Sequence, residues 1–290
     1  MYGFLILLVS ASFYASYGVF SKIIGSSFAP FTQAWTRGMV SLVCFTVFGL
    51  VTKSFIKIKK KDIKWFLLIW LVGALAIAPT FYSLANLHIG TALFIQYAAT
   101  VITSHLVGVF FLNERLTKKS LISLIIAFVG LMLVYWGDLY FNKPIPVLAA
   151  IISGSFFSIW FSFSKKISSK YPTNELNTLG YIFAVILNLL IALILGEKLN
   201  TNFVSKAWLA NIGYGIVGFL GSGLTLYGFK YVDAHKGSII LLSEIVFGTM
   251  FGFILFGEFL SITTLVGGVL IIFSIVLPNI SKIVRSRNKA

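Results

Sequence analysis

Long apolar runs, separated by short polar breaks, dominate the pattern of this chain. Each run is about 20 residues long, the length that an α-helix needs to cross a bilayer. Proline, basic residues and Asn- or Gly-containing segments mark the breaks. The pattern therefore predicts an all-α membrane protein with ten transmembrane helices. The predicted spans are 3–23, 31–52, 65–85, 90–112, 119–137, 145–164, 174–196, 207–229, 236–257 and 262–280.

The second half of the sequence repeats the first. Ser10, Ser12, Phe13, Phe20, Ser21 and Lys22 recur at an offset of 143 as Ser153, Ser155, Phe156, Phe163, Ser164 and Lys165. Gly108, Glu114, Leu116 and Leu121 recur at an offset of 144 as Gly252, Glu258, Leu260 and Leu265. Five spans is an odd number, so the second repeat would cross the bilayer inverted. We therefore expect two inverted five-helix repeats, 1–142 and 143–290, an arrangement that builds carriers opening alternately to each side.

The composition changes the meaning of the net charge. Only 11% of the 290 residues are charged, against about 25% in soluble domains. A net charge of +15 would suggest nucleic-acid binding in a soluble protein. Here most of the basic residues lie in loops between apolar runs. We therefore expect the lipid bilayer as a partner and no nucleic acid.

The distribution of Lys and Arg predicts the orientation of the chain. The loops after even-numbered spans, together with the C-terminal tail, hold 18 of the 23 Lys and Arg residues. Basic loops stay in the cytoplasm, so both termini are expected there. The protein itself is expected in the inner (plasma) membrane. The N-terminus lacks a basic region and a cleavage signal and is interpreted as an uncleaved first span.

Two short motifs close the predicted spans four and nine. They read Phe111-Leu112-Asn113-Glu114-Arg115-Leu116-Thr117 and Leu255-Phe256-Gly257-Glu258-Phe259-Leu260-Ser261. Both are similar to the Leu-Gly-Glu-Arg-Leu-Thr signature of the drug/metabolite transporter superfamily, EamA-type branch, whose members carry one copy per half. The resemblance covers essentially the whole chain. It implies a ten-span transporter of amino acids, amines or related metabolites, often working in the export direction.

Glu114 and Glu258, inside these motifs, are interpreted first as parts of a tight turn between helices. Thr117 and Ser261 follow them and are good N-cap residues for the next helices, because a hydroxyl oxygen accepts a hydrogen bond from a free backbone N–H. A contribution of the two glutamates to gating is the alternative.

The family pattern is broken at three positions. Asn113 replaces a glycine, Ile245 replaces the usual proline after a glutamate, and Thr100 is the first-half counterpart of Glu244. The last two positions lie where the family's central cavity would be. The resemblance therefore does not fix the substrate.

Polar side chains at mid-span are the first group of candidate substrate-binding residues. An ionisable group there is costly and usually faces a cavity or a partner. Glu244 is interpreted as a substrate ligand, as a proton-coupling carboxyl, or as a hydrogen-bonding group between helices. Gln96 and Thr100 share one helix face of span four. Arg37, about 10 Å inside span two, either reaches the lipid headgroups or binds an anionic substrate group.

Aromatic residues within the spans are the second group of candidates. Tyr14, Tyr82, Trp160 and Tyr227 each combine an apolar ring with a polar tip, which suits stacking on a substrate or, equally, helix packing. Tyr82 and Tyr227 are also related to each other by an offset of 145.

Motifs for catalysis and metal binding are absent from the sequence. It contains no His-Glu-x-x-His, Gly-x-Ser-x-Gly or phosphate-loop string, so no catalytic residue and no cofactor is expected. Cys44 is the only cysteine, which excludes a thiolate metal cluster. His105, toward the cytoplasmic end of span four, is interpreted as an interhelical hydrogen-bond partner, with a proton relay as the alternative. It cannot form a metal site alone, because His88 and His235 are predicted at different membrane edges.

The sequence therefore predicts a secondary transporter of small polar metabolites that exports or exchanges them by alternating access. Protons are a candidate coupling ion, and the protein is expected to be a monomer or a homodimer. Two alternatives come from other classes: a membrane-embedded enzyme acting on a lipid-linked substrate, and a passive channel. The enzyme would need polar groups clustered at one interface, and the channel would show flux without saturation.

Overall fold

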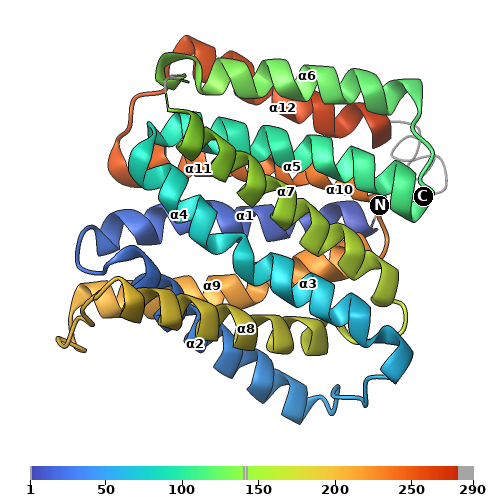
Figure 1. The fold of residues 1–290 in the computed structure, drawn as a ribbon. Helices are drawn as coiled ribbons and strands as arrows, with labels where there is room; N and C mark the ends of the chain where they lie inside the picture. Colours follow the sequence, from blue (N-terminus) through green and yellow to red (C-terminus); the bar gives the residue numbers. More distant parts are fainter. Residues whose placement is uncertain (1, 140, 142, 280–290) are drawn as a thin grey trace.

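The computed structural model describes residues 2–139, 141 and 143–279. All secondary-structure elements within these ranges are helices. Its helices lie side by side and run between two ends of one bundle (Figure 1). We call the end where α1 begins and α2 ends the lysine-rich end, because the loop of residues 53–61 lies there. The helices are α1 (Tyr2–Ile24), α2 (Pro30–Val51), α3 (Ile63–Leu75), α4 (Ile77–Asn86), α5 (Ile89–Leu112), α6 (Lys118–Val134), α7 (Pro144–Ile167), α8 (Thr173–Ile194), α9 (Lys206–Phe229), α10 (Ala234–Leu241), α11 (Ser243–Phe256) and α12 (Ile262–Val276).

The lengths and composition of the helices identify a multi-pass membrane protein. Eight helical stretches among the described residues are long and apolar enough to cross a membrane. The consecutive pairs α3–α4 and α10–α11 each form one of these stretches. Helices α6 and α12 are shorter, with 17 and 15 residues. The all-α membrane fold is confirmed, and ten crossings remain a prediction.

Two of the predicted spans are broken into two helices each. Pro79 lies just after the break at Ala76; a proline lacks the N–H for the helical bond and its ring collides with the carbonyl four residues earlier. The second break, at Leu242, has no proline. There the backbone bonds tighten to the i to i−3 pattern, with Leu242 N bonding Ile239 O at 3.1 Å and Ile245 N bonding Leu242 O at 3.0 Å.

Close packing between helices of the two halves fixes the centre of the bundle. α1 packs against α9, α2 against α8, and α5 against α7. α9 also lies close to α2, because a Cβ atom at Gly215 would stand only 2.7 Å from the carbonyl oxygen of Arg37. Ser41 Oγ donates to the Gly215 carbonyl at 2.7 Å, and Asn211 donates to the Thr36 hydroxyl at 2.8 Å. These contacts fix the position of the Arg37 backbone.

Candidate functional site

Arg37 extends from α2 into a group of aromatic rings inside the bundle. Its guanidinium carbon lies 4.2 Å from the ring centre of Tyr214 on α9, 5.5 Å from that of Tyr17 on α1 and 5.9 Å from that of Phe81 on α4. Contacts of this kind stabilise a desolvated cation by about 0.5–2 kcal/mol. Among the described residues, no carboxylate forms an ion pair with Arg37. The guanidinium donors are therefore suited to an anionic ligand, which favours this interpretation over contact with headgroups.

Glu244 lies in the first turn of α11, directly after the break in the helix. The positive end of a helix dipole favours a carboxylate at this position. Tyr97 on α5 and Tyr14 on α1 are tyrosines that interact electrostatically with the Glu244 carboxyl. The Tyr14 ring in turn contacts the Tyr17 ring edge to face, with centres 5.3 Å apart. The two tyrosines of α1 thus connect the surroundings of Glu244 with those of Arg37.

We call this group of residues the central site. Helices of both sequence halves contribute to it, which places it where the halves meet. Its members are Tyr14, Tyr17, Arg37, Phe81, Tyr97, Tyr214 and Glu244.

Of the other candidates on α5 and α7, Thr100 and Trp160 take part in helix packing, and Gln96 has an unpaired acceptor atom. The Thr100 hydroxyl donates to the carbonyl oxygens of Gln96 at 2.8 Å and of Gly154 at 3.0 Å, so it joins α5 to α7. The side-chain oxygen of Gln96 is buried and has no hydrogen-bond partner among the described residues. Trp160 packs its indole ring against Gly73 of α3. Gln96 is therefore the candidate of this set with a free polar atom.

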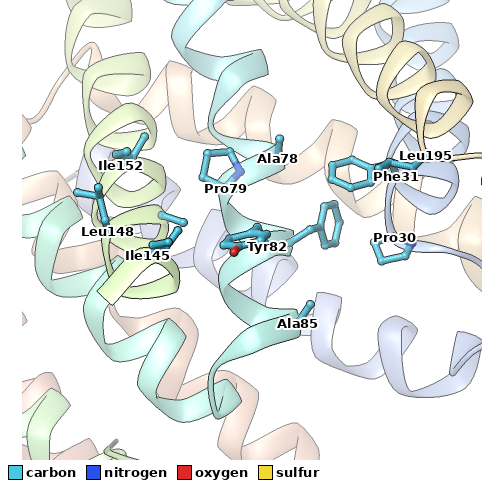
Figure 2. Close-up of a pocket in the computed structure, with 12 residues that line it drawn as sticks. Pro30, Phe31, Ala78, Pro79, Tyr82, Ala85, Ile145, Leu148, Ile152 and Leu195 are labelled. Atoms are coloured by element: carbon cyan, nitrogen blue, oxygen red, sulfur yellow. The ribbon is translucent and has the colours of Figure 1, made fainter. Parts of the chain in front are cut away.

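Tyr82 lines an apolar groove at the end of the bundle opposite the lysine-rich end. The groove has a volume of about 580 Å³. Figure 2 shows Ile145, Leu148 and Ile152 of α7 on one side of α4, and Phe31 of α2 on the other. The ring of Phe31 lies 5.7 Å from that of Phe81 in an edge-to-face contact. Since Phe81 also lies beside Arg37, the groove adjoins the central site. The remaining lining residues are Pro30, Ala78, Pro79, Phe81, Ala85, Ala149 and Leu195.

Tyr227 lies at the lysine-rich end, in a cluster of three tyrosine rings. Its ring centre is 6.2 Å from that of Tyr2 and 5.5 Å from that of Tyr231. The backbone is also tight here, since a Cβ atom at Gly3 would lie 2.7 Å from the Tyr231 Cβ. Tyr82 and Tyr227 are thus at opposite ends of the bundle, and neither is among the neighbours of Arg37 described above.

The two signature motifs form helix–helix turns, as the sequence indicated. Asn113 and Gly257 adopt the left-handed backbone conformation, with φ of 54° and 65°. Asparagine tolerates this region better than other residues with a side chain, which explains why it can stand in for glycine. Thr117 accepts the backbone N–H of Ser120 at 3.2 Å, and Ser261 accepts that of Thr264 at 3.1 Å. Both predicted N-caps are confirmed.

The glutamates of these motifs pair with the repeated lysines, across the two halves. Lys165 Nζ lies 2.6 Å from Glu114 Oε1 at the lysine-rich end, and Lys22 Nζ lies 2.7 Å from Glu258 Oε1 at the opposite end. The Glu114 carboxylate also accepts hydrogen bonds from the Ala234 backbone N–H and the His235 ring. Its side chain is 5% exposed, whereas that of Glu258 is 52% exposed. The first ion pair is buried and the second is solvated.

The pKa of Glu114 reflects this environment. Burial disfavours its charged form, but the hydrogen bonds from His235 and Lys165 outweigh burial and lower the pKa of the carboxyl. A lowered carboxyl pKa means that the stabilisation is present above the ordinary value of about 4.3 and is lost as the pH falls through the folded value. The buried pair is therefore retained throughout the neutral range.

Exchanging the charges of the two pairs is expected to have unequal effects. The double exchange Lys22→Glu with Glu258→Lys should change thermal stability little, because exposed pairs contribute about 0–1 kcal/mol. Glu114→Lys with Lys165→Glu should destabilise strongly, by about 3–5 kcal/mol, because the Ala234 and His235 donors would then face an ammonium group. Thermal unfolding of the purified variants measures both effects, and equal losses would contradict the assigned difference in burial.

Sequence reasoning missed four residues of the central site, namely Tyr17, Phe81, Tyr97 and Tyr214. Tyr17 lies three residues after Tyr14 and so shares its helix face, a signal that could have found it. No pattern around Tyr214 connects it to Arg37, because their contact depends on how α9 packs against α2. Tyr97 lies within a predicted span, as several other tyrosines do, and nothing in the sequence distinguishes it from them.

Comparison with known proteins agrees with this fold. The model of the EamA-like transporter family matches residues 1–136 and again residues 144–280. A protein of Helicobacter pylori (strain ATCC 700392 / 26695), named "Uncharacterized transporter", is 24% identical over 97% of both chains. A protein of Archaeoglobus fulgidus with the same name is 29% identical over 57% of this chain and 58% of its own. A solved structure titled "Crystal structure of protein" superposes with a TM-score of 0.80, at 16% identity, over 96% of this chain and 98% of that one.

The two family matches together cover nearly all the described residues, one in each half of the sequence. The names of the relatives and of the family point to transport and not to an enzyme. The multi-pass helical bundle, with its ion pairs repeated between the halves, fits this assignment. The chain belongs to the EamA-like transporter family.

Proposed function

We propose that this protein is a secondary transporter that moves small polar metabolites bearing a carboxylate, such as amino acids, through the central site by alternating access. The observation that carries the proposal is Arg37, a cation among three aromatic rings to which no described carboxylate is paired. A guanidinium binds a carboxylate through two parallel hydrogen bonds. The tyrosine rings around it suit a substrate with an apolar or aromatic part.

Glu244 gives the site its second charge-bearing group. A carboxyl beside Tyr97 could accept a hydrogen bond from the ammonium group of a zwitterionic substrate or carry the coupling proton. Either role makes the site bipolar, with Arg37 for the anionic end of the substrate. Export, as in the family resemblance, is the direction we propose.

Inverted repeats with ten crossings are supported by contacts that exchange between the halves. Ser123 donates to the Ser274 carbonyl at 2.5 Å, and Gly130 faces the Gly267 carbonyl closely. At the offset of 144, Ser123 corresponds to Gly267 and Gly130 to Ser274. One contact is therefore the counterpart of the other, as expected of a two-fold axis between α6 and α12. The two glutamate–lysine pairs, at opposite ends of the bundle, are related in the same way.

Alternating access is supported by a difference between the two ends. At offsets of 143 and 145, Ile145 and Tyr82 are the counterparts of Tyr2 and Tyr227. Tyr2 and Tyr227 are in contact, whereas Ile145 and Tyr82 line the groove. Two halves that are alike in sequence but packed differently at the two ends are what an alternating carrier stopped in one state would show. We infer that the lysine-rich end is closed and the opposite end open.

The lysine-rich end is, in this proposal, the cytoplasmic one. Single cysteines introduced at Lys57 and Asn202, on a Cys44→Ser background, test the orientation. An impermeant thiol reagent added to intact cells should label the cysteine at position 202 and leave that at position 57 unlabelled until the membrane is opened. The reverse pattern would contradict the orientation.

Purified protein in liposomes provides the functional test. Vesicles loaded with a pool of unlabelled amino acids and related carboxylates should take up one labelled member of the pool by saturable counterflow. Flux that rises linearly with concentration would instead support the passive channel. Conversion of a lipid-linked compound, without counterflow, would support the membrane enzyme.

A further inference from the structure

His105 lies buried at the lysine-rich end of α5, and one of its ring nitrogens is unused. His105 is only 5% exposed. Nδ1 lies 2.8 Å from the Val101 carbonyl oxygen of the same helix, so Nδ1 carries the proton of the neutral ring. Nε2 is then a bare acceptor, and it has no hydrogen-bond partner among the described residues. The interhelical hydrogen bond expected from the sequence is not formed.

Neither His235 nor Glu114 offers His105 a free acceptor. The ring of His235 on α10 lies 5.3 Å away, centre to centre. His235 Nδ1 is 2.8 Å from Glu114 Oε2, and its Nε2 is 3.4 Å from the Ser120 hydroxyl. Both oxygens of Glu114 are thus occupied, one by His235 and the other by Lys165 and the Ala234 N–H.

The charges around His105 are already balanced. The acidic groups that face this region are Glu114 and Asp233, and the basic groups are Lys165 and Lys236, with His235 between them. Each acid is paired with a lysine. A proton on Nε2 of His105 would therefore add a positive charge that neither of these acids is free to balance, which is costly in a buried place.

We propose that Nε2 of His105 is a proton-binding site that controls the mouth at the lysine-rich end. Water hydrates the ring when this mouth opens, and a hydronium ion on that side can then give its proton to the Nε2 lone pair. The proton returns to water before the mouth closes. Acid on the lysine-rich side therefore favours the open mouth and slows the return step of transport. The inference rests on the proposed alternating access.

The opposite mouth lacks this site. At the offset of 144, the counterpart of His105 in the other half of the sequence is Thr249, and the counterpart of His235 is Thr91. Its ion pair, between Lys22 and Glu258, is solvated. Control by protons is thus confined to one face of the transporter, the cytoplasmic face in the proposed orientation.

The test measures the width of the lysine-rich mouth as a function of pH. Spin labels are placed at two exposed positions outside the cluster, Arg115→Cys and Ser169→Cys, on a Cys44→Ser background in liposomes. Distances are recorded at about pH 8 and about pH 5.5, on either side of the ordinary imidazole pKa of about 6.5. The long-distance population should grow in acid, by at most about tenfold per pH unit, the limit for one proton. In His105→Gln the distribution should stay short at both values.

Matched variants separate this site from its neighbours. His88→Gln, at the other end of α5, should keep the full pH response. His235→Gln should open the mouth somewhat at every pH, because Glu114 loses the hydrogen bond from the His235 ring, and should still respond to acid. A response that survives in His105→Gln, or that disappears only in His235→Gln, overturns the proposal. His105→Asn serves as the second variant if His105→Gln unfolds.

Failure of this proposal is distinguishable from failure of the transport mechanism. If counterflow is present and His105→Gln keeps the pH response, only the proton site is wrong. If counterflow is absent and the mouth never changes width, with or without substrate, the alternating mechanism itself fails.

Discussion

Arg37→Ala is expected to lower substrate affinity by roughly 10- to 100-fold, or to abolish transport at ordinary substrate concentrations. The guanidinium is the cation that the central site offers to a carboxylate, and a charge-assisted hydrogen bond contributes about 1.5–3 kcal/mol. The measurement is the half-saturation concentration for counterflow. Folding of the variant is checked by thermal unfolding, because the Tyr214 ring also loses its contact with the cation.

Arg37→Lys is the matched control for this prediction. It keeps the charge but loses the planar pair of donors and part of the stacking on the rings. Its affinity should lie between those of the wild type and Arg37→Ala. Amines without a carboxylate should compete with the labelled substrate only weakly, and to the same extent in all three proteins. Wild-type affinity in Arg37→Ala would show that the residue is a packing element and not a ligand.

Glu244→Gln is expected to abolish accumulation driven by a pH gradient while leaving counterflow measurable. Glutamine keeps the size and much of the hydrogen-bonding capacity of the glutamate side chain and removes the group that takes up and releases a proton. The measurement compares uptake with and without an imposed gradient in the same vesicles. Gradient-driven uptake equal to that of the wild type would exclude Glu244 as the coupling site. Loss of both activities would instead assign it to substrate binding.

The fold was largely predictable from sequence, because its signals are local. Apolar runs of bilayer length and the hydroxyl residues Thr117 and Ser261 each act over a few residues. Pro79 is also a local signal, but 65–85 was predicted as one unbroken span and the break at Ala76 was missed. The left-handed turn at Asn113 follows from the position of glycine in the second copy of the motif. The break at Leu242 was not predictable, since Ile245 stands where a proline would have indicated it.

The site was only partly predictable, because its contacts join distant parts of the chain. Arg37 and Glu244 were found because ionisable groups inside spans are rare. The ring of Tyr214 over Arg37, and the approach of His235 to His105, depend on which helices pack together. The sequence placed His105 and His235 at the same membrane side without indicating that their rings would meet.

The repeat, in contrast, gave the sequence a long-range signal. Lys22 and Lys165 were recognised only as repeated residues, and Glu114 and Glu258 as repeated residues within the turn motifs. The structure joins each lysine to the glutamate of the other half. Tyr82 and Tyr227 were related by sequence offset alone. Their different surroundings, one open and one closed, could not be predicted because the two halves have similar sequences.

Disulfide locking of the two mouths tests the central claim most directly. On the Cys44→Ser background, the pair Tyr2→Cys with Tyr227→Cys locks the lysine-rich end, and the pair Tyr82→Cys with Ile145→Cys locks the opposite end. A short bifunctional thiol reagent joins the two cysteines where their sulfurs are too far apart to form a disulfide. Each cross-link alone should stop counterflow in liposomes, and reduction of the bond should restore it. Undiminished counterflow with either mouth locked in most molecules would contradict a carrier that opens alternately at these two places.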